Sequence, residues 1–496
     1  MKLNALVAWR YTSDLFNFDQ MLQQTMHGRF GLEYTYGNMF GDHAYLSLLV
    51  LVPVKAFAGA GMAGILLLCG PLAFVLGLVA FLATSEATDP LAAAAVSMVM
   101  LLHLGLGQGL LEITYGFAPD IVSGFAAMAM AAALDALLER RTTISRGVRG
   151  VFIVSALVFL LTKEEMALLG ILFFGVLALD RRARAWRRSA LGWLAASAAI
   201  LIGDFLLIRI CQSPWNRTDL ALLHGLLDRA WSGELALLLR SSDARPYLIF
   251  AAGSLLSFAT VCVLADRVQP VAWALAAMGL AKLAFSLSVS DFDLASWHNY
   301  PAVVMLMGAV FIQWRAARSR DVAASKRRLA ALFVYVLLLV EIIGAATVDG
   351  PWLWQKWQRD RLHRALVAAW SGEISWLQSH MERSRVVSIE PETATAWSGG
   401  FRVAFFPRGV SESPIGIADY VVLWRRSAAT SQLSEFAMLA STPSFTLFQR
   451  VNLAPSRRVC RRRFVERFGA SAIGVDSPAG GQYLVPAGQT KSGRLP

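Results

Sequence analysis

The chain is poor in charged residues. Asp, Glu, Lys and Arg make up 16% of its 496 residues, whereas soluble globular proteins have roughly 25%. Hydrophobic residues reach 56%, and one soluble core cannot bury that excess. This composition excludes an ordinary soluble enzyme, a disordered chain and a nucleic-acid-binding domain. It indicates an α-helical polytopic membrane protein.

Several familiar chemical signatures are also missing. The four cysteines are widely spaced and form no CxxC pair, which argues against a disulfide framework and a zinc site. The sequence contains no phosphate-binding GKS/T loop, no HExxH and no GxSxG, so no ATPase, zinc protease or serine hydrolase is indicated. Charges within the apolar stretches are few, and Asp135, Asp204 and Lys282 are among them. A proton-coupled transporter is expected to carry more of them.

Long apolar stretches are what the sequence has instead. A membrane-spanning helix needs about 20 mostly apolar residues. We predict about ten spans, at 62–83, 91–111, 121–138, 148–162, 166–180, 189–210, 247–264, 270–288, 299–314 and 329–348. The triplet Lys163-Glu164-Glu165 separates two short stretches, which we interpret as a helical hairpin. The apolar segment 44–58 contains Pro53 and is predicted to be a juxtamembrane or re-entrant helix.

Three short loops between predicted spans are basic, and cytoplasmic loops are typically the basic ones. These loops, at 139–147, 181–188 and 315–328, share one side only if the hairpin consists of two spans. The segments predicted to lie on the outer face are then 1–61, 112–120, 163–165, 211–246, 289–298 and 349–496. An external amino terminus in turn predicts a first transmembrane helix before residue 1.

The composition changes after residue 348, which ends the predicted transmembrane domain, 1–348. Residues 349–383 are rich in Trp, Arg and Gln, which predicts an amphipathic interfacial linker. Short β-type runs at 385–389, 403–406, 420–424 and 445–448 predict a small extracytoplasmic α/β domain over 384–452. Residues 453–496 are basic and then rich in Gly and Pro, which predicts a disordered tail.

Polar candidates gather in the predicted outer segments. They are Asp14, Asp19, Asp42, His43, Asp120, Lys163, Glu164, Glu165, Arg245, Asp291, Asp293, His298 and Tyr300. Acidic residues near helix ends often only cap a helix or face solvent, and this interpretation remains open for each of them. Function is favoured for the triplet 163–165, because its turn is too short to carry three charges far into water and charges at a membrane boundary are costly.

The order of short motifs along residues 9–450 resembles a known family. The motifs are Asp14 to Gln20, His27-Gly28-Arg29, Gly41-Asp42-His43, Gly116 to Asp120, Thr162 to Glu165, His298-x-Tyr300, Phe406-Pro407 and Ala418 to Leu423. This order resembles a bacterial family of multi-spanning membrane proteins of unknown function. That family is similar to GT-C glycosyltransferases, integral membrane enzymes that use polyprenyl-phosphate sugars. The chain departs from the family at Phe117 to Asp120, where a His and a Glu are usual.

The resemblance implies a role for each candidate. Asp14 would be the general base in the first outer loop, and Asp19 is the second catalytic candidate. Lys163, or else Arg245, would stabilise the charge of the departing phosphate. Asp42, His43 and Asp120 could hold a divalent metal ion, with no cofactor required. The expected substrate-binding residues are Lys163, Glu164, Glu165, Arg245, His298 and Tyr300.

The sequence therefore predicts a GT-C-type glycosyltransferase of the cell envelope in a bacterial inner membrane. It would transfer a hexose or pentose from a polyprenyl-phosphate donor to an extracytoplasmic glycan, lipid or protein acceptor. Its partners would be this donor and the lipid bilayer, and no nucleic acid. Two alternatives stay open: a transporter or flippase of a lipid-linked glycan, and a non-catalytic subunit of an envelope-glycan assembly complex.

Overall fold

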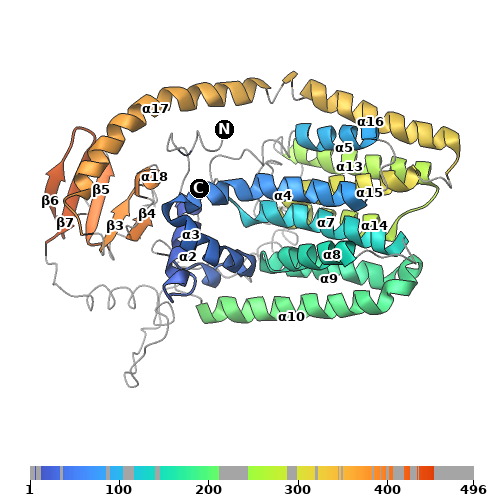
Figure 1. Cartoon of the computed structure of the whole chain (residues 1–496), viewed down its shortest axis with the longest axis horizontal. Helices are drawn as coiled ribbons and strands as arrows, with labels where there is room; N and C mark the ends of the chain where they lie inside the picture. Colours follow the sequence, from blue (N-terminus) through green and yellow to red (C-terminus); the bar gives the residue numbers. More distant parts are fainter. Residues whose placement is uncertain are drawn as a thin grey trace, which may run out of the picture.

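We analysed a computed structural model of the full chain. It describes residues 6, 13–33, 37–84, 90–103, 117–139, 146–211, 244–286, 299–318, 322–344, 346–347, 350–382, 385–390, 393–397, 402–405, 418–424, 433 and 435–451. Within these residues the chain forms a bundle of long helices and a small sheet at one end of the bundle (Figure 1). The predicted tail at 453–496 lies outside the described residues.

The bundle consists of roughly parallel and antiparallel helices (Figure 1). They are α4 (Met62–Thr84), α5 (Pro90–Leu102), α7 (Pro119–Glu139), α8 (Arg146–Leu160), α9 (Glu164–Leu179), α10 (Arg187–Cys211), α13 (Ala244–Ala265), α14 (Pro270–Ser286), α15 (Tyr300–Ala317) and α16 (Ala324–Gly344). Their sequences are apolar on most sides, as expected for helices that meet either lipid or one another.

Five helical segments among the described residues are long and apolar enough to cross a membrane. They are Met62–Leu82, Pro119–Glu139, Arg181–Cys211, Leu248–Ala265 and Tyr300–Ala317, which coincide with five of the predicted spans. The segments Leu46–Ala58 and Pro270–Phe285 are apolar but shorter. The chain is therefore a membrane protein with several apolar helices, and the total of about ten spans stays a prediction.

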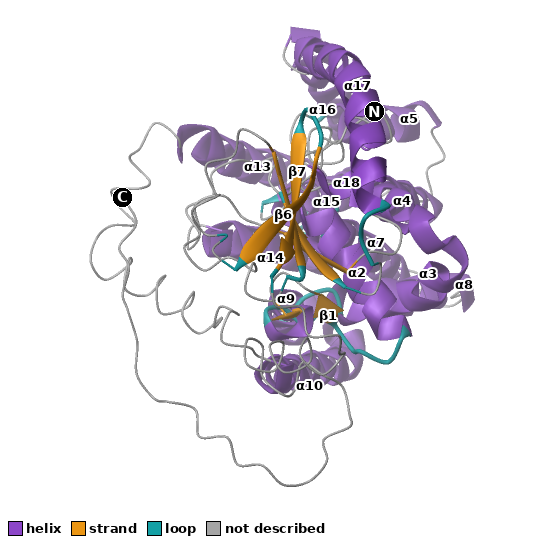
Figure 2. Cartoon of the chain, turned by 90° about the vertical axis from the view of Figure 1, so that its left-hand side faces the viewer, coloured by secondary structure: helices purple, strands orange, loops and turns teal. Residues whose placement is uncertain are grey.

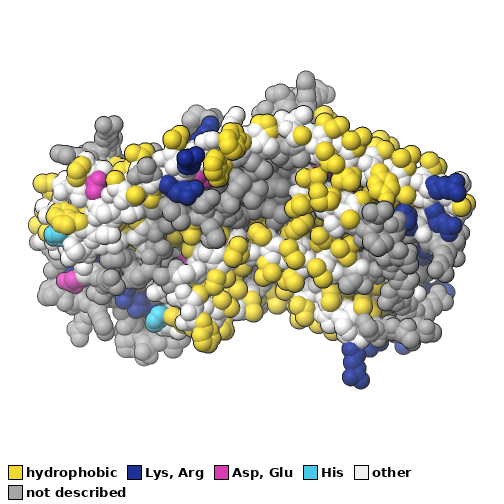
Figure 3. Space-filling view, turned by 45° about the horizontal axis from the view of Figure 1, so that its top comes forward, with side chains coloured by type: hydrophobic (Ala, Val, Ile, Leu, Met, Phe, Trp, Pro, Cys, Tyr) yellow, Lys and Arg dark blue, Asp and Glu magenta, His cyan; other side chains and the backbone are white. Residues whose placement is uncertain are grey.

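Helices α7 and α15 form the centre of the bundle. In the spanning window of α15, 94% of the residues are buried, against 17% in the windows at Leu248–Ala265 and Arg181–Cys211. A close approach of α7 and α15 requires Gly124, because a Cβ there would lie 3.0 Å from the Cα of Pro301. Apolar side chains on the outer helices cover much of the bundle surface (Figure 3), as expected where lipid is the solvent.

Helices α8 and α9 form the expected hairpin. The chain turns at Leu161 and Thr162, and Lys163 precedes the first turn of α9. The turn folds α9 back onto α8 so closely that a side chain at Gly170 would collide with Leu160. The triplet at 163–165 therefore lies at one end of the bundle. The connections from α9 to α10 and from α15 to α16 lie at the opposite end (Figure 1).

That opposite end is rich in arginine, and several of its charges pair between helices. Arg315 of α15 forms an ion pair with Asp135 of α7. Gln269, ahead of α14, donates to Glu139 at 3.2 Å. Lys and Arg side chains gather at this end of the molecule (Figure 3). The basic connections thus share one end, as the sequence predicts, and their cytoplasmic placement remains a prediction.

Short elements precede the bundle. They are α2 (Ser13–Met26), β1 (Leu32–Glu33), β2 (Gly37–Asn38), η1 (Met39–Gly41), η2 (Leu46–Leu51), α3 (Val52–Ala58) and η3 (Gly59–Gly61). The apolar segment 44–58, predicted to be a juxtamembrane or re-entrant helix, forms two short consecutive helices, η2 and α3. Pro53 lies in the first turn of α3, where its missing N–H breaks no hydrogen bond.

A small sheet follows the long helix α17 (Gly350–Gln378), as Figure 2 shows. Its strand order is β4-β3-β5-β7-β6, with β3 parallel to β4 and β5 and the other pairs antiparallel. The elements are β3 (Val386–Ile389), α18 (Ala394–Trp397), β4 (Arg402–Phe405), β5 (Tyr420–Trp424), β6 (Phe436–Ser441) and β7 (Phe445–Arg450). Four of these strands match the predicted runs, and β6 was not predicted.

The sheet packs against α2 at the end of the bundle that holds the triplet 163–165. Gln20 of α2 donates its side-chain N–H to the carbonyl of Val403 at 2.7 Å. Leu15 and Phe16 share an apolar cluster with Val387 and Trp397. This contact makes α2 the link between the sheet and the helical bundle.

Candidate functional site

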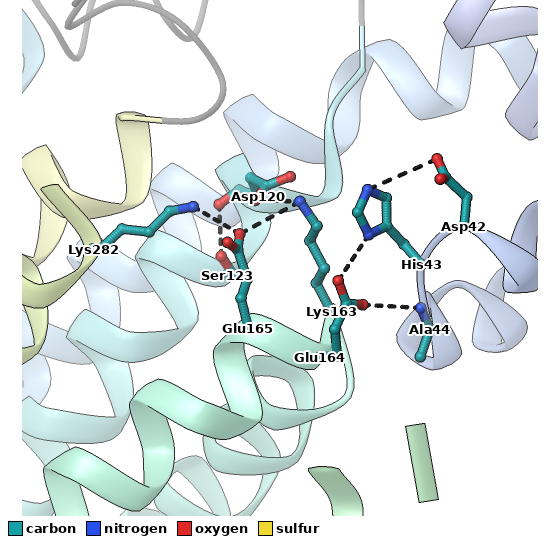
Figure 4. A network of polar contacts seen from close by, with 9 residues as sticks. All are labelled: Asp42, His43, Ala44, Asp120, Ser123, Lys163, Glu164, Glu165 and Lys282. Carbon is teal, nitrogen blue, oxygen red and sulfur yellow. Dashed lines mark hydrogen bonds and ion pairs between the residues drawn. The ribbon is translucent and has the colours of Figure 1, made fainter. Parts of the chain in front are cut away.

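Charged side chains from four separate elements meet at this end of the bundle (Figure 4). The segment before η2 supplies Asp42 and His43, and the first turn of α7 supplies Asp120. The α8–α9 turn and the start of α9 supply Lys163, Glu164 and Glu165. Helix α14 supplies Lys282. We call these seven residues the charged network. The sequence predicted all of them as site residues except Lys282.

Lys163 lies at the centre of the charged network. Its side chain is only 4% exposed, and its Nζ is 3.5 Å from Oε1 of Glu165 and 4.0 Å from Oδ1 of Asp120. Burial alone would lower the pKa of Lys163, but the carboxylates of Asp120 and Glu165 raise it well above its ordinary value. The ammonium group therefore stays charged at any physiological pH.

Glu165 also contacts a second lysine. The Nζ of Lys282 lies 2.7 Å from Oε1 of Glu165. Lys282 is 1% exposed and its ammonium also faces the ring of Phe285, 5.5 Å from the centroid. The sequence marked Lys282 as a charge within an apolar stretch. It could not show that the partner is 117 residues away.

Glu164 belongs to the other half of the network. Its Oε1 accepts from Nδ1 of His43 at 2.7 Å, and its Oε2 accepts from the backbone N–H of Ala44 at 3.1 Å. Asp42 approaches the other ring nitrogen of His43 at 3.8 Å. Burial and Lys163 lower the pKa of His43, but Glu164 and Asp42 raise it by more, so the pKa ends above its ordinary value.

Asp120 is the most deeply placed carboxylate of the network. It is fully buried, and neither carboxylate oxygen has a hydrogen-bond partner in the part of the chain that the structure describes. Lys163, at 4.0 Å, compensates its charge without a short contact. Burial raises the pKa of Asp120 to about 6, although the ammonium of Lys163 opposes that rise.

The three expected metal ligands do not come together. His43 contacts Glu164 and Asp42, whereas Asp120 lies beside Lys163. Among the described residues no group of three His, Cys, Asp or Glu side chains could hold a metal ion. The cations of the charged network are Lys163 and Lys282, both in contact with Glu165.

The two aspartates of α2 differ in position. Asp14 lies in the first turn of α2, and its side chain is outside the described residues. Asp19 is buried, and its Oδ1 accepts from Nζ of Lys55 in α3 at 2.6 Å. Phe18 packs edge-on against Tyr45, with ring centroids 5.4 Å apart, so α2 borders the charged network. Lys55 was missed in the sequence, although it is the one charged residue of the segment 44–58.

The other predicted substrate-binding residues are less informative. Tyr300 is fully buried at the start of α15 and packs edge-on against Phe125, at 5.8 Å between centroids. Arg245 lies in the first turn of α13, and its side chain is outside the described residues, as is His298. Their substrate-binding roles stay predictions.

Comparisons with known proteins identify a fold but no family. No family model matches the sequence, and no curated protein matches it. The structure is similar to the crystal structure of ArnT from Cupriavidus metallidurans bound to undecaprenyl phosphate, with a TM-score of 0.50 and 14% sequence identity. The match covers 91% of this chain and 98% of that one. The chain therefore has a GT-C-like fold.

The Asp19–Lys55 pair yields a stability prediction. Both side chains are less than 8% exposed, and removal of one partner of a buried ion pair typically costs about 3–5 kcal/mol. We expect Lys55→Met to lower the free energy of unfolding of the protein in detergent by about 3–5 kcal/mol. The double variant Lys55→Met/Asp19→Asn should recover part of that loss, because it leaves no charge unpaired. The exposed pair Lys326–Asp266 gives the control, because Lys326→Met should cost less than about 1 kcal/mol. Equal losses in Lys55→Met and Lys326→Met would contradict the prediction.

The His43–Glu164 pair yields a pH prediction. A group whose pKa is raised by folding stabilises the protein below its unfolded pKa, and that contribution is lost as pH rises through the folded pKa. We expect the unfolding temperature to fall as pH rises above the ordinary pKa of histidine and through the raised pKa of His43. Glu164→Gln should remove this component. Asp42→Asn, at a carboxylate that is 45% exposed, should keep most of it. Parallel pH profiles for wild type and Glu164→Gln would refute this assignment.

Proposed function

We propose that the protein is a membrane glycosyltransferase that transfers a sugar from a polyprenyl-phosphate donor to an extracytoplasmic acceptor. The observation that carries the proposal is Lys163, a buried ammonium 3.5 Å from Oε1 of Glu165 and 4.0 Å from Oδ1 of Asp120, at one end of a GT-C-like bundle. The similar protein ArnT was crystallised with undecaprenyl phosphate, a ligand whose anionic phosphate suits such an ammonium.

The chemistry follows from the donor. The bond between the sugar carbon and the phosphate oxygen breaks as the acceptor hydroxyl oxygen attacks that carbon, and the polyprenyl phosphate departs as an anion. Lys163 would stabilise the negative charge that develops on the phosphate. Asp14 would take the proton of the acceptor hydroxyl as general base. Asp19 is less suited to this step, because its carboxylate already binds Lys55.

The position of the network supports a lipid-linked donor. The charged groups lie at the end of the apolar bundle that faces α2, and the sheet packs on α2 (Figures 1 and 4). A polyprenyl tail would stay among lipids while its phosphate reached the network. The basic connections lie at the other end of the bundle, so the positive-inside rule favours an extracytoplasmic site in a bacterial inner membrane. The sheet would bind the acceptor or cover the site.

Turnover by membranes that contain the protein tests the proposal. The probes are undecaprenyl phosphates that carry a labelled hexose or pentose, offered with envelope-glycan acceptors. We expect wild type to release label from the donor lipid, and Asp14→Asn to lower the rate by about 10²–10⁴-fold, the usual contribution of a general base. Asp266→Asn, at the opposite end of the bundle, is the matched control and should keep wild-type turnover.

Other outcomes would replace the proposal. Movement of the intact donor across the membrane, without a new glycosidic bond, would identify a transporter or flippase. Absence of turnover with every donor would favour a non-catalytic subunit. Equal turnover in wild type and Asp14→Asn would remove Asp14 from the role of base and leave the transferase.

A further inference from the structure

We propose that Asp204 of α10 binds the sugar of the lipid-linked donor by accepting hydrogen bonds from its hydroxyl groups. This inference rests on the proposed function and deepens it, because it adds a residue that recognises the sugar. Asp204 is not one of the seven residues of the charged network, and the mechanism proposed above does not use it.

Asp204 is a buried carboxylate on a helix that mostly faces outward. Only 17% of the spanning window at Arg181–Cys211 is buried, yet Asp204 is 1% exposed. In the part of the chain that the structure describes, neither of its carboxylate oxygens has a hydrogen-bond partner. An apolar side chain would fill the same place without the cost of burying such a group. A residue that breaks this rule indicates a functional position.

The packing of α10 on α9 places Asp204 beside the start of α9. Ser197 and Asp204 are two turns apart on the buried face of α10. Ser197 packs against Gly170 of α9, where a Cβ would lie 3.0 Å from its Oγ. The two helices run in opposite directions (Figure 1). Asp204 comes seven residues after Ser197. Lys163 comes seven residues before Gly170, so the two helices bring Asp204 level with Lys163.

Two further observations agree with this placement. Glu164, which belongs to the charged network, acts electrostatically on Asp204. The segment η1, which leads into Asp42 and His43, also packs against α10. Asp204 therefore lies on the α10 side of the charged network, close to Glu164.

The chemistry of this position favours neutral hydroxyl groups. A carboxylate accepts hydrogen bonds, and its two oxygens can accept from two neighbouring hydroxyls of one sugar. Asp204 and Glu164 would repel an anionic phosphate. In the proposed mechanism the phosphate lies at Lys163, and the sugar is bonded to that phosphate. The sugar is thus the part of the donor that fits beside Asp204.

A sugar has to gain access to this carboxylate. The side chain of Asp204 is covered in this structure, so contact with a sugar requires neighbouring elements to move apart. Such opening and closing around a substrate is common in enzymes. The hydrogen bonds that form would then compensate a carboxylate that is costly without them.

Binding measurements on the purified full-length protein in nanodiscs test this inference. The probes are undecaprenyl phosphate alone and undecaprenyl phosphate that carries glucose, galactose or xylose. We expect wild type to bind at least one sugar-bearing probe more tightly than undecaprenyl phosphate. Asp204→Leu should raise the Kd of that probe by about 10- to 100-fold, the range for loss of a hydrogen bond to a charged group. The Kd of undecaprenyl phosphate should stay nearly unchanged.

The stability of the variants separates ligand binding from a structural role. Asp204→Leu removes an unpartnered buried carboxylate, so we expect a higher unfolding temperature for the ligand-free protein. Asp204→Asn keeps one acceptor oxygen and should lose less affinity, and it gives the comparison if Asp204→Leu does not fold. Ser197→Ala, on the same face of α10, is the control and should bind every probe as wild type does.

Other results would overturn the inference. If wild type and Asp204→Leu show the same preference for the sugar-bearing probes, Asp204 does not contact the sugar. Weaker binding of every probe together with a lower unfolding temperature would assign Asp204 a structural role. Unchanged donor affinity with a raised KM for an acceptor glycan would place Asp204 at the acceptor instead. Failure of wild type to bind any probe is a separate result, which would remove the proposed function itself.

Discussion

The need to compensate buried charge is the constraint on which this structure depends. Lys163, Glu165 and Lys282 are each less than 8% exposed, and a charge buried to that extent is costly unless an opposite charge compensates it. Their pairing ties the α8–α9 turn to α14, while Lys163 reaches toward Asp120 in α7. The apolar helices form the bundle, and these ion pairs link several of its helix ends. The same contacts create an ammonium that an anionic lipid headgroup could use.

Sequence reasoning identified most of this site, for physical reasons. The triplet 163–165 had to be unusual, because a turn between two spans gives three charges no route to water. Asp120 and His43 were selected by their place in predicted outer segments. The partners of these residues were not predictable. Lys282 and Lys55 were visible as single charges in apolar segments, yet their contacts with Glu165 and Asp19 depend on tertiary packing. The contact of His43 with Glu164 was likewise not predictable, and among the described residues His43, Asp42 and Asp120 form no metal-binding group.

The fold was predictable to a similar extent. Apolar length identified the spanning helices, and runs of β-branched and aromatic residues identified β3, β5 and β7. Strand β6 was not predicted, because its sequence, Phe436 to Ser441, consists mainly of Ala, Met and Leu, which favour helices. It is an edge strand made by pairing with β7, a tertiary effect that overrides local propensity. The interfacial position of α17 and the side of the membrane on which the sheet lies depend on the bilayer.

A structure of the protein with undecaprenyl phosphate, solved by cryo-electron microscopy in nanodiscs, tests the central claim most directly. The claim is that Lys163 receives the phosphate of a lipid donor. We expect phosphate density within hydrogen-bond distance of the Nζ of Lys163, with Lys282 still on Glu165. Phosphate density at the basic connections of the opposite end, with the charged network unchanged, would contradict the account.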